Sequence, residues 1–351
     1  MKDFERKLNK LLDIYNIPLQ ENWEEWIAPD KYTVYKYWLN NGLINKDEFN
    51  AIYPSKKVQL NNAIAAFFKT IDYHYKPNYY INGSVADVGS GFGYITFWLI
   101  LSGAKHVITI GDPVRIGFIQ KLYDRAIELN LIDAGKISFK PEFIKVGDTT
   151  LSKDIAKGSL SLVLLCDTLE HITPRIFTSL VKSVYNDLKP GGFFISWAQN
   201  SDSPSMLEKL KVIWEKTEKN TYINQRLKII QYRIPNISEV DANNLAVNTR
   251  GLDSVDFYGA IKNYEEGKVI PHFNPNLPAI DVEYDIPEEG DTSIERICSE
   301  FRKNNFTMIK VYPEMRNSRR SRYFQPLAKF IPKPFLKLHI FDESTVFFIS
   351  K

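Results

Sequence analysis

Short apolar runs alternate with longer segments whose apolar positions recur at helical spacing through the middle of the chain. This alternation predicts strands joined by helices, and hence an α/β fold with a mostly parallel, doubly wound sheet. The predicted strands lie at 85–88, 106–110, 160–166 and 193–197, with a further strand region formed by 137–139 and 143–146. The predicted helices lie at 94–102, 115–130 and 173–188.

The residues between these segments support the assignment. Gly103 follows the first helix, and Thr173-Pro174 supplies a cap and a first-turn proline for the third. Lys189-Pro-Gly-Gly192 predicts a turn into the last of these strands. The run at 160–166 lacks polar–apolar alternation, which is typical of a strand covered on both faces.

A glycine-rich turn follows the first predicted strand, in the sequence Asp87-Val-Gly89-Ser90-Gly91-Phe-Gly93. Glycine permits the unusual dihedral angles of a tight turn and lets a ligand approach the backbone closely. The next helix would direct unpaired N–H groups at such a ligand, and the Asp87 carboxylate can accept from a hydroxyl or bind a cation. The pattern predicts a site for a nucleoside-containing cofactor, although a plain connection can also be rich in glycine.

Four acids follow successive predicted strands: Asp87, Asp112, Asp148 and Asp167. The carboxyl ends of parallel strands meet at one edge of a doubly wound sheet, and ligands bind in the crevice beyond that edge. Any one of these acids alone would be explained as a turn or cap residue. Together they predict an acidic rim around a single crevice.

Composition and charge exclude several classes of protein. The chain has 351 residues, 44% of them hydrophobic, and a formal net charge of +3, which gives no overall signal for binding a polyanion. Its two cysteines, Cys166 and Cys298, are expected to be buried thiols in a reducing compartment. The first helix is amphipathic and unlike a signal peptide, and no apolar run approaches the ~20 residues of a membrane span. We therefore expect a cytoplasmic protein.

Five motifs in order resemble the class I S-adenosylmethionine-dependent methyltransferases. They are Asp87-Val-Gly-Ser-Gly-Phe-Gly93, Asp112, Gly147-Asp148, Cys166-Asp-Thr-Leu-Glu-His171 and Leu188-Lys-Pro-Gly-Gly192. The resemblance spans about 84–200. It implies a seven-stranded, mostly parallel Rossmann-like sheet whose last strand is antiparallel, and the strands at 306–311 and 345–349, preceded by a helix at 293–304, would complete it.

The resemblance also implies roles for individual residues around S-adenosylmethionine. The glycine-rich turn would approach the methionine part of the cofactor, and Asp87 would orient that part. Asp112 would accept from the ribose hydroxyls, Asp148 would accept from the adenine amino group with Thr149 beside it, and Asp167 would line the crevice near the sulfonium. The implied cofactor-binding set is Asp87, Gly89, Ser90, Gly91, Gly93, Asp112, Asp148, Thr149 and Asp167.

Two comparisons sharpen the resemblance. Relatives usually carry Phe-Asp before the fourth strand, where this chain has Leu160-Ser161. The Asp of that pair is usually structural, so its replacement does not argue against cofactor binding. A nicotinamide-binding fold would favour G-x-G-x-x-G, whereas this turn is G-x-G-x-G, and the later Leu-Glu-His and Lys-Pro-Gly-Gly segments have no role there. The methyltransferase interpretation is therefore preferred to an oxidoreductase.

Methyl transfer to a hydroxyl needs a base, and two histidines are candidates. His171 follows the fourth strand, where its alternative role is structural, and His272 would serve if its segment folds over the cofactor. Asp167, Glu170 and His171 are also similar to a divalent-cation cluster of some 2′-O- and quinone-ring methyltransferases. No further ligand is evident, so we assign no metal.

The chain divides into a helical N-terminal cap at 1–80, including a helix at 57–74, a methyltransferase core at 81–200, an insertion at 201–292 and a completion of the core at 293–351. The insertion is polar and aromatic, which suits a sugar-like acceptor but also a lid or an oligomer surface. The segment 316–337 holds seven bases and no acid, while 281–300 holds eight acids and one base. The basic segment suits a phosphate-bearing acceptor, RNA, an anionic membrane surface, or simple pairing with the acidic stretch.

These observations favour O-methylation of a sugar, a glycan precursor or another small hydroxylated metabolite. RNA 2′-O-methylation is the alternative enzyme activity. A non-catalytic protein that binds S-adenosylmethionine is the alternative from a different class.

Overall fold

A computed structural model describes most of the chain outside the second half of the N-terminal region and the basic C-terminal segment. The described residues are 2–20, 83–142, 144–145, 147–269, 277–282, 286–287, 290, 292–313 and 344–351.

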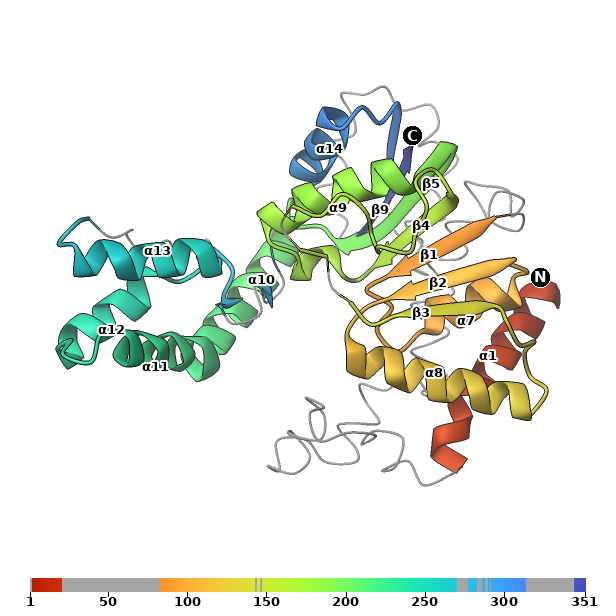
Figure 1. Ribbon diagram of the computed structural model, residues 1–351, viewed down its shortest axis with the longest axis horizontal. Coiled ribbons are helices and arrows are strands. Elements are labelled where there is room, and N and C mark those ends of the chain that lie inside the picture. The colour runs from red at the N-terminus through yellow and green to blue at the C-terminus, as the bar shows by residue number, and fades with distance from the viewer. Residues whose placement is uncertain are drawn as a thin grey trace.

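The centre of the molecule is a seven-stranded sheet with the order β3-β2-β1-β4-β5-β9-β8 (Figure 1). Strands β1 to β5 are parallel, and β9 runs antiparallel to both of its neighbours. The seven-stranded, mostly parallel sheet with an antiparallel last strand confirms the fold expected from the sequence. Its strands are β1 Ser84–Val88, β2 His106–Ile110, β3 Ile137–Lys140, β4 Leu160–Cys166, β5 Leu188–Gln199, β8 Met308–Pro313 and β9 Ser344–Ser350.

Helices cover both faces of this sheet. One face packs against α1 Lys2–Gln20, α7 Tyr94–Leu101 and α8 Pro113–Glu128, and the other against α9 Pro174–Asp187 and α14 Ile294–Lys303. Successive residues of β1 point to opposite faces, because Val85 belongs to the first core and Ala86 to the second. The continuous apolar run at 160–166 forms β4, which is buried along its whole length because helices cover both faces of the sheet.

Two elements differ from the sequence prediction. The third strand ends at Lys140, and residues 144–145 are not in a strand, while Phe143 and Val146 lie outside the described residues. The predicted turn Lys189-Pro-Gly-Gly192 lies within β5 as an irregularity, because Leu160 pairs with Leu188 and Leu162 pairs with Phe193. The turn residues therefore bulge out of a strand that starts earlier than expected.

The N-terminal cap is described only for α1, which packs on α7 and α8 through its apolar face. The predicted helix at 57–74 lies outside the described residues. None of the helices described combines the length and the apolar character that a membrane span requires. Both cysteines are buried free thiols, as expected.

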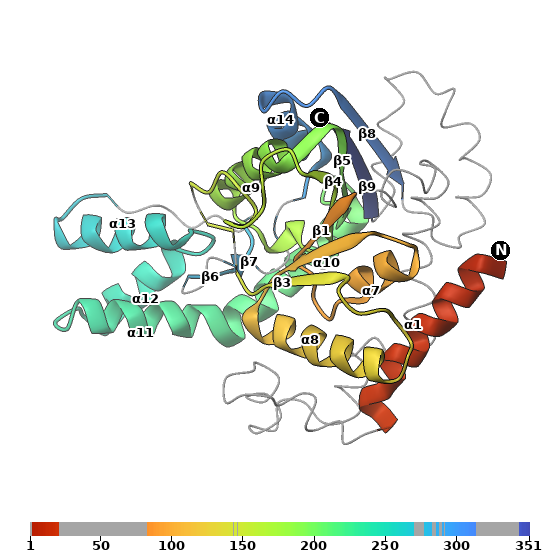
Figure 2. The same ribbon diagram turned by 45° about the vertical axis from the view of Figure 1, so that its right-hand side comes forward.

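The insertion after β5 forms a helical lobe that projects from the sheet (Figures 1 and 2). A π-helical turn, η2, connects its first two helices, and a small core centred on Ile230, Leu245 and Phe257 holds the helices together. The polar and aromatic composition of this segment did not predict its helices. The helices are α10 Pro204–Thr217, η2 Glu218–Tyr222, α11 Ile223–Arg233, α12 Glu239–Asn248 and α13 Ser254–Glu265.

Two sets of contacts tie the lobe to the sheet domain. Arg175 at the start of α9 forms ion pairs with Asp253 and Asp256 of α13 and its cap, at 3.3 and 2.6 Å. The hairpin of β6 Ile280–Asp281 and β7 Ile286–Pro287 then contacts η2 on one side and the loop after β4 on the other. The lobe thereby returns to the carboxyl edge of the sheet.

Candidate functional site

The glycine-rich turn between β1 and α7 has left-handed backbone angles at all three glycines. The φ angles are +71° at Gly89, +53° at Gly91 and +80° at Gly93. A Cβ atom at Gly89 would lie 2.4 Å from the Thr168 side chain, and one at Gly93 would lie 2.8 Å from Ile119. Apart from the two neighbouring residues of the chain, none of the described residues places an atom within 4 Å of a Cβ built at Gly91. Protein packing therefore explains the first and third glycines, whereas the second faces open space that a ligand can enter.

The same turn is hydrogen-bonded to the end of β2. The Gly89 and Ser90 amides both donate to the Ile110 carbonyl, at 2.9 and 3.2 Å, and the Gly93 amide donates to the Ser90 carbonyl at 2.7 Å. The Ser90 hydroxyl is buried, and no hydrogen-bond partner for it occurs among the described residues. The turn is thus fixed beside the loop that carries Asp112.

Asp87 lies at the end of β1 beneath this turn and is only 1% exposed. The Thr96 hydroxyl donates to its carboxyl group at 2.6 Å. Burial raises the pKa of Asp87 to about 7, and the hydrogen bonds from Thr96 only partly oppose that rise. A buried carboxyl group of this kind gains from a positively charged partner.

Asp112 follows β2 and caps α8. Its carboxylate accepts from the Arg115 amide at 3.1 Å, and its carbonyl accepts from the Ile116 amide at 2.8 Å. The Arg115 guanidinium in turn lies 5.9 Å from the centre of the Phe92 ring in the glycine-rich turn. Capping accounts for the position of Asp112, and its partly exposed side chain lies at the carboxyl edge of the sheet beside that turn.

The loop after β4 completes this edge. Asp167 is exposed and has a left-handed backbone with φ +53°, and its amide donates to the Trp197 carbonyl at 2.9 Å. The next residue, Thr168, connects the two loops, because its hydroxyl lies 3.4 Å from the Gly89 carbonyl. The structure therefore brings Asp87, the glycine-rich turn and Asp167 together.

Sequence reasoning missed Tyr94, the first residue of α7. Burial and the negative charges of Asp167, Asp87 and Glu170 hold the pKa of Tyr94 well above its ordinary value. Tyr94 therefore lies within electrostatic reach of these three acids. The available signal was its position directly after Gly93.

His171 lies in the 3₁₀ turn η1 Leu169–His171, against the β6–β7 hairpin. Its Nδ1 atom is 3.3 Å from the Pro287 carbonyl, and the backbone carbonyl of Glu170 accepts from the Gly290 amide at 2.5 Å. When Nδ1 carries the proton and donates to that carbonyl, Nε2 is the unprotonated nitrogen. The returning insertion thus sets the orientation of the imidazole.

Asp148 and Thr149 lie in the long loop between β3 and β4. The Asp148 carboxylate accepts from the Lys145 amide at 2.6 Å, and the Thr149 carbonyl accepts from Asn186 at 2.8 Å. Asn186 is close to the end of α9, which leads into the start of β5. These contacts hold the Thr149 main chain beside the end of α9.

The remaining candidates are a metal ion, His272 and the basic segment. Within the described part of the chain, no group of three His, Cys, Asp or Glu residues is arranged to hold a metal ion. Asp167, Glu170 and His171 therefore do not form such a group in this structure. His272 and the basic segment 316–337 lie outside the described residues.

The chain was compared with known proteins. No family model matches it, and no curated protein matches it by sequence. Solved structures that resemble it include a SAM-dependent methyltransferase from Archaeoglobus fulgidus, at 11% identity and a TM-score of 0.43, covering 82% of this chain and 94% of that one. Another is an S-adenosylmethionine-dependent methyltransferase from Mesorhizobium loti, at 11% identity and a TM-score of 0.41, covering 82% and 98%.

A third such structure is a SAM-dependent methyltransferase from Methanosarcina mazei, at 15% identity and a TM-score of 0.43, covering 80% of this chain and 96% of that one. Identities and TM-scores this low carry no conclusion about activity. What the site does must follow from its own residues.

Proposed function

We propose that this chain is an S-adenosylmethionine-dependent methyltransferase with the cofactor across the carboxyl ends of β1, β2 and β4. The observation that carries the proposal is the Gly91 position, which is open to a ligand in the turn that follows the strand of the buried Asp87 carboxyl group. The class I order of the strands supports it independently, because it sets the loops after these strands side by side.

The residues of the crevice fit this cofactor. S-adenosylmethionine supplies an electrophilic methyl group on a sulfonium, and it also carries an ammonium group and a ribose with two hydroxyls. The carboxyl groups of Asp87, Asp167 and Glu170 lie within electrostatic reach of Tyr94, and their ionised forms would attract the two cationic groups. Asp112, at the end of β2, would accept from the ribose hydroxyls. Asp148, partly exposed in the loop that follows β3, would accept from the adenine amino group with Thr149 beside it.

The chain's own contribution to the reaction is positioning, exclusion of water and removal of a proton. Methyl transfer from a sulfonium is an in-line displacement, so the acceptor must be held against the methyl group in a fixed direction. The β6–β7 hairpin would form the wall on the acceptor side, since Pro287 and Gly290 contact the loop after β4. His171 would take the proton from an acceptor hydroxyl through Nε2.

The acceptor that we propose is a small hydroxylated molecule such as a sugar or a glycan precursor. The support is the combination of a histidine base with a helical lobe that carries exposed tyrosines. Tyr232 is 83% exposed, and the ring of Tyr258 stacks with Arg233 at 5.3 Å. Tyrosine rings offer apolar faces to sugar rings, and neighbouring polar groups accept and donate hydrogen bonds.

Calorimetric titration with S-adenosylmethionine tests the cofactor. Gly91→Leu should abolish binding, because its side chain enters the open space above the turn. Gly135→Leu is the matched control, since Gly135 also has a left-handed backbone, with φ +74°, and no atom within 4 Å of a Cβ, but lies in the loop before β3. Equal binding by the wild type and Gly91→Leu would refute the assigned position.

Mass spectrometry of cell extract incubated with isotopically labelled cofactor tests the acceptor. An O-methyl label in a small hydroxylated molecule supports the proposal, a label in RNA selects 2′-O-methylation of RNA, and binding without transfer selects a non-catalytic role. His171→Ala should lower transfer about a hundredfold or more with unchanged cofactor affinity. His106→Ala is the control, because His106 pairs with Ser138 at the start of β2. Full transfer by His171→Ala would remove this residue as the base.

A further inference from the structure

The N-terminal helix α1 holds the glycine-rich turn from behind. The Tyr15 hydroxyl donates to the Phe92 carbonyl at 2.7 Å, across 77 positions of sequence. Tyr15 is fully buried, and its ring packs edge-to-face on Phe97 of α7 with centroids 5.9 Å apart. One side chain of α1 therefore contacts both the turn and the helix that follows it.

Phe92 stands between two glycines with left-handed backbone angles, Gly91 and Gly93. Glycine loses more conformational freedom on ordering than any other residue, so a segment of this composition needs outside contacts to keep one conformation. The side chain of Phe92 is held by α8, where its ring lies 5.6 Å from that of Phe118. Its main chain is held by α1 through Tyr15.

We propose that Tyr15 is a positioning residue for the cofactor, which acts by fixing the main chain of the glycine-rich turn before the cofactor arrives. The proposal rests on the proposed function, because it concerns the affinity of the same site for S-adenosylmethionine. Tyr15 does not reach the ligand itself, since its hydroxyl is buried against the Phe92 carbonyl. It makes α1, far away in sequence, a part of the binding site.

Tyr15→Phe is the direct test, because it removes only the hydroxyl and keeps the ring on Phe97. In the full-length protein we expect S-adenosylmethionine to bind about fivefold to tenfold more weakly, the ratio that corresponds to one net hydrogen bond. In the ligand-free protein, the amides of residues 89–97 should exchange with solvent faster than in the wild type.

Tyr123→Phe is the matched control. Tyr123 is also a buried tyrosine of the same helical layer whose hydroxyl donates to a main-chain carbonyl, that of Asp133, at 3.0 Å. This control should leave the cofactor affinity and the exchange of residues 89–97 at wild-type values. Equal weakening by both variants would show a general loss of stability and overturn the role of Tyr15.

A second measurement needs no variant. If the contact of α1 with the turn strengthens cofactor binding, cofactor binding must strengthen that contact equally. Addition of S-adenosylmethionine to the wild type should therefore slow the amide exchange of residues 11–17 in α1. Unchanged cofactor affinity and unchanged exchange in Tyr15→Phe would overturn the inference while leaving the proposed function intact. If the wild type binds no cofactor, the proposed function fails, and the exchange of residues 89–97 in ligand-free Tyr15→Phe still decides whether Tyr15 orders the turn.

Discussion

The Thr96 hydroxyl donates a 2.6 Å hydrogen bond to the Asp87 carboxyl group and thereby joins the first turn of α7 to the end of β1. The same hydroxyl lies 3.2 Å from the Thr109 hydroxyl on β2. All three side chains are buried, and the pair of threonines replaces only part of the water that an ionised carboxylate would attract. This relationship leaves Asp87 with a pKa of about 7 and underlies the first two predictions.

Asp87→Asn should stabilise the fold at alkaline pH. The pKa of Asp87 rises from 3.8 to about 7 on folding, so between these values the native state binds more protons than the unfolded state and stability falls as pH rises. The asparagine variant loses this dependence. As the pH rises from 5 to 8, the free energy of unfolding of the variant should increase by roughly 2–3 kcal/mol relative to that of the wild type, as measured by urea unfolding.

Asp124→Asn, on the exposed side of α8, provides the comparison for this experiment. Its unfolding free energy should follow the wild-type pH dependence closely. Parallel curves for Asp87→Asn and the wild type would mean that Asp87 does not titrate in this range.

Cofactor affinity should depend on pH through the same group. If Asp87 pairs with a cationic part of S-adenosylmethionine, binding requires the ionised carboxylate, which predominates only above a pH of about 7. Titration calorimetry should give an affinity about tenfold weaker at pH 6 than at pH 8. A pH-independent affinity of the wild type would exclude an ionic role for Asp87.

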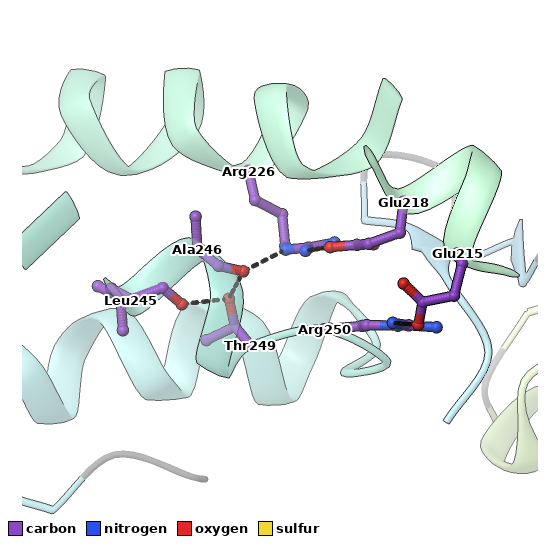
Figure 3. A network of polar contacts seen from close by, with 7 residues as sticks. All are labelled: Glu215, Glu218, Arg226, Leu245, Ala246, Thr249 and Arg250. Atoms are coloured by element: carbon purple, nitrogen blue, oxygen red, sulfur yellow. Dashed lines mark hydrogen bonds and ion pairs between the residues drawn. The ribbon is translucent and has the colours of Figure 1, made fainter. Parts of the chain in front are cut away.

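Arg226→Met should unfold the helical lobe locally. Arg226 is fully buried, pairs with Glu218 across the π-helical turn and donates to the Ala246 carbonyl at 3.0 Å (Figure 3). Removing the Arg226 guanidinium leaves the buried Glu218 carboxylate without its partner, which should lower the free energy of unfolding by about 3–5 kcal/mol. Limited proteolysis should cleave the lobe of the Arg226→Met variant faster than that of the wild type.

Two further variants separate pairing from packing in the lobe. The double substitution Glu218→Met with Arg226→Met removes both charges and should recover much of the loss. Lys211→Met, in an exposed ion pair of α10 with Glu208 at 3.0 Å, should change stability by less than about 0.5 kcal/mol. A single Arg226→Met variant as resistant to protease as the wild type would mean that the pair is not needed to hold α11 on η2.

Gly93→Ala should destabilise the protein through packing. Its methyl group would lie 2.8 Å from Ile119 on a backbone with φ +80°, and overpacking and strain together cost about 2 kcal/mol or more. Gly117→Ala, at an exposed helical position in α8 with no atom within 4 Å of the new Cβ, should instead stabilise by about 0.5–1 kcal/mol. Thermal unfolding distinguishes the two, and a Gly93→Ala variant as stable as the wild type would contradict the assigned packing.

The order of the sheet elements was predictable because each element leaves a local pattern. The helices at 173–188 and 293–304 were placed within two residues of α9 and α14 by cap residues and apolar spacing. The third strand was less accurate, because apolar residues at 143–146 follow β3 closely and nothing local separates them from it. The helices of the lobe escaped prediction because their apolar residues are few and their core is small.

Local patterns along the chain predicted the fold class and the glycine-rich turn with Asp87, since strand periodicity and the need for glycine at left-handed angles are properties of short segments. Which of these residues act together depends on how the elements pack in three dimensions. This packing separated Gly91, which faces open space, from Gly89 and Gly93, which face Thr168 and Ile119. It also brought Tyr15 to the turn and Pro287 to His171. These pairs lie 77 and 116 positions apart, and contacts at such separations depend on how whole elements pack, which no local pattern records.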